Sequence, residues 1–208
     1  MNKSKLKQAE KNFLDRYPQG FNSPEMQEIS KKHKMEKLID FSHEKFAPEA
    51  LYDVEETSEN MIRMVQRSTM VSVFEKPKFR DAVRSMSLDD KTILVDSLQE
   101  LLHGEEAKGF NQMLDLLTKH SLAKWTIITV FRCYYYPDTD FLFKPTTVKN
   151  IIKNFDVEEL VYKPRPSYDF FFRYRDVINN MKKEVDPSIA VYNAGFCGFL
   201  MMSMEMMN

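Results

Sequence analysis

The amino-acid sequence predicts an all-α protein, a single globular multi-helix domain of about eight or nine helices around a buried aromatic-rich helix. Glycine is scarce, with 5 in 208 residues, and the helix-forming residues Glu, Lys, Leu and Met are abundant. Apolar residues recur at helical spacing along most of the chain. The segment 125–136 is apolar almost all round, which is typical of a helix at the centre of a domain.

Helix boundaries in the first part of the chain are marked by capping residues and prolines. A first helix is predicted over residues 6–17. Ser23 is a suitable N-cap, and Pro24 suits the first helical position because an N–H is not needed there. We expect the helix that starts there to continue to about Lys45. The acidic segment 53–59 is expected to be a solvated turn, and it is a weak candidate for a domain boundary.

Further helices are predicted along the rest of the chain. Met61 and Ile62 belong to one, Pro77 lies in the first turn of another, and Ser87 begins the clearest. The remaining helices are expected over about residues 110–120, 125–136, 145–153, 167–184 and 188–206.

The last predicted helix carries small side chains at every fourth position, namely Ala190, Ala194 and Gly198. Such a stripe lies on one face of a helix and lets a second helix approach closely. We expect it to be the helix-packing stripe that docks the C-terminal helix on the rest of the domain. A contact between two copies in a homodimer is the alternative.

The charge and the cysteine content argue against two classes of protein, dedicated nucleic-acid binders and zinc proteins. The chain has 30 basic and 31 acidic residues, whereas nucleic-acid binders usually show a strong basic excess. Nucleic acid is therefore an open but unfavoured partner. Cys133 and Cys197 have no Cys or His neighbour at a zinc-binding spacing, and we expect neither a metal nor a cofactor.

The hydrophobic segments are too short for a membrane helix. None reaches the roughly 20 apolar residues that a membrane span needs. The lysine-rich segment 1–13 also lacks the apolar stretch of a signal peptide. We therefore expect a cytoplasmic protein without a membrane partner.

Basic residues at two predicted helix starts form a candidate anion or nucleic-acid site, because a helix N-terminus attracts negative charge. A structural role, with Arg80 clamping two segments together, is the competing interpretation for the first cluster. The lysine and arginine side chains of the candidate set are Lys76, Lys78, Arg80, Lys144, Lys149, Lys153 and Arg165.

Aromatic residues are concentrated between positions 125 and 174, where prolines interrupt the helices. This segment suggests a place where several elements meet, with a pocket or a partner surface. The side chains expected to form it are Trp125, Arg132, Tyr135, Tyr162, Tyr168 and Phe171. An enzymatic site would need groups such as Arg132, Tyr134 and Asp138 to converge in the fold.

Three short blocks resemble those of an uncharacterised family of bacterial all-helical proteins. They are 74–81 (FEKPKFRD), 144–149 (KPTTVK) and 162–166 (YKPRP). The resemblance covers about residues 10–200, and it implies a bacterial, cytoplasmic, helical domain that takes up the whole chain. No activity is known for that family, so the resemblance assigns no catalytic residue.

The sequence favours a non-enzymatic protein-interaction or scaffold module with an unidentified protein partner. One alternative is a nucleic-acid-associated accessory factor that uses the basic residues. The second alternative is an enzyme whose site is not contiguous in the sequence, although no catalytic residue is assigned.

Overall fold

The computed structural model describes residues 1–207, with side chains up to Met204. Helices make up 71% of the chain, and no strand occurs among the described residues, so the predicted all-α class is confirmed. The helices are α1 (Lys3–Arg16), η1 (Gly20–Asn22), α2 (Pro24–His33), α3 (Met35–Lys45), η2 (Pro48–Ala50), α4 (Val54–Arg67), α5 (Glu75–Ser85), α6 (Leu88–His103), α7 (Glu106–Lys119), α8 (Trp125–Tyr135), α9 (Pro145–Asn154), α10 (Tyr168–Lys183) and α11 (Asn193–Met207), where η marks a 3-10 helix.

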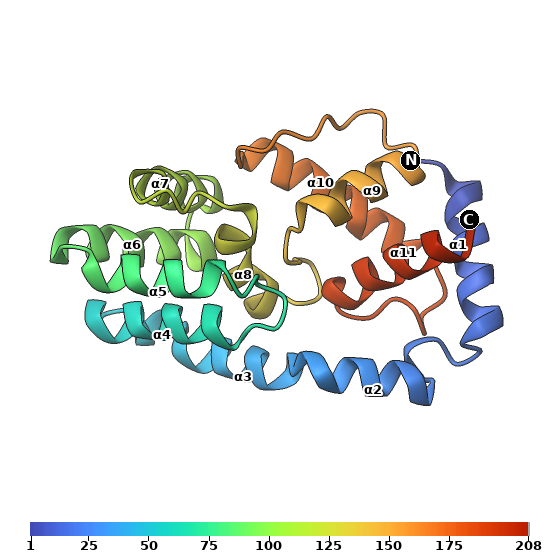
Figure 1. Ribbon diagram of the computed structural model, residues 1–208, viewed down its shortest axis with the longest axis horizontal. Helices are drawn as coiled ribbons and strands as arrows, with labels where there is room; N and C mark the ends of the chain where they lie inside the picture. The colour runs from blue at the N-terminus through green and yellow to red at the C-terminus, as the bar shows by residue number, and fades with distance from the viewer. Residues whose placement is uncertain (208) are drawn as a thin grey trace.

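The helices form two groups on either side of α8 (Figure 1). Helices α4, α5, α6 and α7 lie on the left in Figure 1, and α1, α9, α10 and α11 lie on the right. Helices α2 and α3 run one after the other along the lower edge. Helix α8 packs against α3, α4, α6 and α7, and α11 packs against α1, α9 and α10.

Helix α8 is enclosed by its neighbours. All of its residues except Thr126 and Tyr135 are buried. The Trp125 indole stacks on the Phe143 ring with 3.9 Å between centroids and an angle of 14°. Offset stacking of this kind adds to the stabilisation that comes from burying the two rings. The buried apolar side chains of the described residues, apart from Val95, belong to one continuous cluster.

The helix expected from Pro24 to about Lys45 is divided at Lys34. This residue has φ 51° and ψ 34°, the left-handed conformation, and it separates α2 from α3. Left-handed backbone is uncommon for residues other than glycine. Because a lysine gives no sign of it in the sequence, this break accounts for part of the difference between the eight or nine helices expected and the larger number observed.

The acidic segment 53–59 is part of a helix rather than a solvated turn. The Asp53 carboxylate accepts a hydrogen bond from the Glu56 N–H at 2.9 Å and caps α4. Glu55 and Glu56 lie in the first turn, where the positive end of the helix dipole favours carboxylates. Thr57, on the inner face, is buried. The prediction of a turn was wrong, because these acidic residues form the start of α4.

Helix α11 docks mainly through large side chains, and its small residues contribute only in part. It begins at Asn193 rather than at 188, so Ala190 lies in the turn that precedes it. The Phe199 ring meets the Phe13 ring of α1 edge to face at 5.1 Å between centroids. Phe196, on the same side as Phe199, is also fully buried. The large aromatic side chains are therefore fully buried, whereas Ala190 and Ala194 of the predicted stripe are only partly buried against the core.

Candidate functional site

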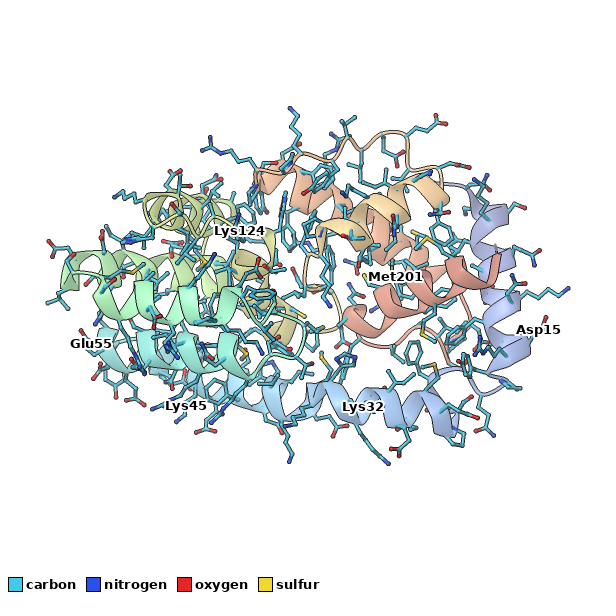
Figure 2. The ribbon with its side chains drawn as sticks, in the orientation of Figure 1. Asp15, Lys32, Lys45, Glu55, Lys124 and Met201 are labelled. Carbon is cyan, nitrogen blue, oxygen red and sulfur yellow. The ribbon has the colours of Figure 1, made fainter. Side chains whose placement is uncertain are left out.

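A groove of about 830 Å³ runs between α2 and the start of α3 on one side and α11 on the other. The turn that holds Ala190 and the loop between α8 and α9 complete its walls. Figure 2 labels Lys32 on α2 and Met201 on α11, the two helices between which the groove lies. Partly exposed residues on both walls, such as Ile29 and Tyr192, show that the groove is open to solvent. We call this feature the α2–α11 groove.

The stripe of Ala190, Ala194 and Gly198 lines the α2–α11 groove. A methyl group placed on Gly198 would meet no heavy atom within 4 Å. Gly198 therefore leaves open space beside α11, whereas Ala190 and Ala194 are partly buried against the core. The predicted helix-packing stripe thus lies on the groove wall and is open to the groove at Gly198.

Most of the groove surface is apolar and rich in thioethers. The methionines that line it come from α2, α3, α11 and the segment after α4, and they are Met26, Met35, Met70, Met201 and Met202. Methionine is flexible and polarizable, so a surface made of it adapts to differently shaped apolar groups. The groove therefore offers an adaptable apolar binding surface beside the stripe of small residues.

Basic side chains outnumber acidic ones around the groove. Lys34, Lys37 and Lys144 line it, and none of them forms an ion pair with another described residue. The acidic lining residues are Glu36 and Asp138. The rim therefore carries positive charge that the described part of the protein does not neutralise.

His33 lies within this positive rim. Its Nδ1 atom is 3.0 Å from Thr69 Oγ1. Partial burial lowers the pKa of His33, and the nearby Lys144 ammonium lowers it further. A lowered pKa favours the neutral imidazole at neutral pH, so the positive charge of the rim comes from its lysines.

Cys197 lies on the groove wall but is only 8% exposed. Burial raises the pKa of its thiol to about 12, although the Lys182 ammonium acts in the opposite direction. A thiol with such a pKa is protonated at neutral pH and is a poor nucleophile. The groove thus offers binding surface, and its cysteine is not activated for covalent chemistry.

The predicted basic set is distributed over three elements. Lys76, Lys78 and Arg80 are on α5, and the Arg80 guanidinium pairs with the adjacent Asp81 at 2.7 Å. Lys149 and Lys153 are on α9, and Lys149 Nζ lies 5.7 Å from the centre of the Tyr162 ring.

Lys144 precedes α9, and Arg165 lies in the exposed segment before α10. Helices α5 and α9 lie in different parts of Figure 1. Of the seven, only Lys144 borders the groove.

The predicted aromatic set lies mostly inside the protein. Trp125, Arg132 and Phe171 are buried. Tyr162 and Tyr168 are partly exposed. Tyr135 is also partly exposed, and its ring lies edge to face with His43 and His103 at 5.0 and 5.1 Å between centroids. None of the six side chains lines the α2–α11 groove.

A buried ionic cluster joins α7, α8 and α10 through the loop after α8. The Asp140 carboxylate is 0% exposed and accepts hydrogen bonds from Arg132 and Arg175, and Arg175 also binds Glu106 in two places. Burial alone would lower the pKa of Arg175, but Glu106 and Asp140 together raise it. Two cations and two anions are thus matched to each other, which indicates a structural role.

The groups named for a non-contiguous enzyme site do not meet at one place. Arg132 is bound to Asp140, and Tyr134 hydrogen-bonds Ser68 at 2.9 Å between hydroxyl oxygens in the core. Asp138 is exposed at the groove. Among the described residues, no three His, Cys, Asp or Glu side chains are placed to hold a metal ion.

Sequence reasoning missed the contribution of α2 and α3 to the site. The signal available was the sparse apolar content of α2, which buries only Met26. A helix with so few core residues leaves most of its surface free, yet the pattern gives no direction for that surface.

The described helices include none that is long and apolar enough to cross a membrane. No family model matches the chain, and neither a curated protein nor a solved structure matches it significantly. The resemblance to a bacterial helical family therefore stays a prediction.

Proposed function

We propose that this chain is a non-enzymatic protein-interaction module and that the α2–α11 groove is its partner surface. The single observation that carries the proposal is the open space beside Gly198, on a helix face that is lined by small residues and borders the groove. Open apolar surface is costly in water, and a contiguous patch of it commonly marks an interaction site.

The buried features of the chain support the same proposal. The ionic cluster around Asp140 is internally matched, and the thiol on the groove wall is protonated. We take the chain to be one domain around α8, because all but one of the buried apolar side chains among the described residues form one cluster. On this view the core provides stability, and the surface between α2 and α11 provides binding.

Site-specific photo-crosslinking in cells tests the proposal. A benzoylphenylalanine placed at Ile29, which is 38% exposed on the groove wall, is expected to give one recurrent adduct with a second polypeptide. The same probe at Val161, an exposed apolar position that does not line the groove, is the matched control. Mass spectrometry of the adducts identifies what is attached.

A groove-filling substitution completes the test. Gly198→Trp directs an indole into the groove from a position where an added Cβ meets no heavy atom within 4 Å, and it should abolish the Ile29 adduct while the circular dichroism spectrum stays helical. Adducts that are the same from Ile29 and Val161, or that persist in a folded Gly198→Trp protein, would contradict the proposed function.

A further inference from the structure

We infer that the α2–α11 groove receives an amphipathic helix of a partner protein, with its apolar face on α11 and acidic side chains toward the basic rim. This inference rests on the proposed function and deepens it by naming the chemistry of the partner. Three features of the groove carry it: the shape of its walls, its charge, and the loose attachment of α2.

The walls fit a helix in length and in closeness of approach. The groove is lined by Met26 to His33 of α2 and by Ala194 to Met202 of α11, which corresponds to walls of about 12 and 14 Å. Small residues at Ala194 and Gly198 allow a partner backbone to come near α11, because interaxial distances depend on the side chains at the contact. The methionines around the stripe can adjust to anchors at i, i+3, i+4 and i+7 of the incoming helix.

The positive charge of the rim favours a partner that carries negatively charged side chains. Lys34 and Lys37 lie at the α2–α3 side, and Lys144 lies at the start of α9, so cations border the groove from separate elements. Two acidic residues, Glu36 and Asp138, share the lining. Apolar surface edged by cations that pair with no acid in the described part of the chain is complementary to an apolar stripe edged by carboxylates.

The α2 wall is the part of the groove that can adapt. It buries one residue, Met26, and Lys34 joins it to α3 in a left-handed conformation. Elements with few buried apolar contacts open and shift at low free-energy cost. Helix α2 therefore closes on an incoming helix more readily than α11, which is fixed to α1 through Phe199.

A display library of helical peptides tests this inference on the full chain. Peptides of about 18 residues carry fixed apolar positions at i, i+3, i+4 and i+7, with all flanking positions randomised. Selection uses the immobilised wild-type protein, with counter-selection on Gly198→Trp and on Ile29→Asp, which spoils the opposite wall without touching the core. The enriched peptides are expected to carry Asp and Glu at the flanks.

Binding of one enriched peptide is then measured by fluorescence anisotropy. The pair Lys34→Glu and Lys144→Glu should weaken binding about tenfold or more, and raising the salt from about 50 to about 500 mM should also weaken it. The matched control pair is Lys32→Glu and Lys153→Glu, on α2 and α9 but outside the groove lining, and it should change binding about twofold at most.

The outcomes separate this inference from the proposed function. Enriched peptides with neutral or basic flanks would overturn the inference but keep the groove as a partner surface. A fluorescent long-chain fatty acid that binds wild-type protein and not Gly198→Trp would overturn it in favour of a lipid ligand. Self-association that Gly198→Trp abolishes would overturn it in favour of a second copy of the chain. An Ile29 crosslink that fails would instead remove the proposed function.

Discussion

The Asp140 carboxylate accepts two hydrogen bonds from Arg132, from Nε at 2.9 Å and from Nη2 at 3.1 Å. Because the Asp140 side chain is wholly buried, its charge depends on these donors and on Arg175 for stabilisation. Asp140→Asn removes the charge while keeping the shape, so it should lower the free energy of unfolding by about 3–5 kcal/mol. Urea denaturation measures this loss.

Asp138→Asn is the control for that substitution. Asp138 lies two residues earlier in the same loop, but it is exposed and its carboxylate pairs with no described side chain. Its replacement should change the free energy of unfolding by about 0.5 kcal/mol or less. Equal effects of the two substitutions would show that the buried cluster does not stabilise the fold.

Removing the hydroxyl of two buried tyrosines should have different effects on the stability of the protein. Tyr134 hydrogen-bonds Ser68, whereas the buried Tyr174 hydroxyl has no partner among the described residues. Tyr134→Phe should therefore destabilise the protein by about 1 kcal/mol, and Tyr174→Phe should be neutral or stabilising. Chemical denaturation of both variants checks the difference. A Tyr174→Phe protein that loses more stability than Tyr134→Phe would contradict it.

Substitution by alanine at two helical glycines should change the stability of the protein in opposite directions. A methyl group on Gly109 would lie 2.6 Å from Ser97 O of α6, whereas one on Gly198 would meet nothing. Gly109→Ala should cost about 1–3 kcal/mol because α6 and α7 must move apart. Gly198→Ala should add about 0.5–1 kcal/mol, since alanine favours the helix. Thermal unfolding measures both, and a destabilised Gly198→Ala protein would show that its groove is filled.

The buried thiol of Cys197 should make stability fall in alkali. Its pKa is raised to about 12 by burial in the folded state, whereas an unfolded cysteine ionises near the ordinary value of 9.0. The folded state therefore keeps a proton that the unfolded state loses between these pH values. The free energy of unfolding should be unaffected by this group below about pH 9 and should decrease by up to about 1.4 kcal/mol per pH unit above it.

Cys197→Ala isolates this contribution from those of the other buried groups. The variant should show a shallower loss of stability between about pH 9 and about pH 12 than the wild type. Denaturant titrations at several pH values provide the two slopes. Identical slopes would mean that the Cys197 thiol ionises equally in both states.

The fold class was predictable because it rests on local signals. Ser23 and Pro24 were correctly placed at the start of α2, and residues 125–136 were correctly expected to be helical. The break at Lys34 was not predictable, because left-handed backbone is uncommon at a lysine and no neighbouring glycine or proline marks it.

The candidate site was predictable only in part. Spacing showed that Ala194 and Gly198 share a face, but spacing alone says nothing about what lies opposite that face. The contact between Asp140 and Arg175 joins residues 35 positions apart, and no local pattern marks such a pair. The elements that form both features come together only when the helices pack.

The edge-to-face contact of Phe13 with Phe199 has a consequence for how the protein is made. During synthesis on a ribosome, α1 emerges long before α11 has been synthesised. The apolar side chains of α1 that pack on α11 therefore stay exposed to solvent for most of translation. Closing a loop of that length is among the slower steps in folding. We therefore expect the nascent protein to reach its native state only after α11 has left the exit tunnel, and to benefit from chaperones that shield α1 until then.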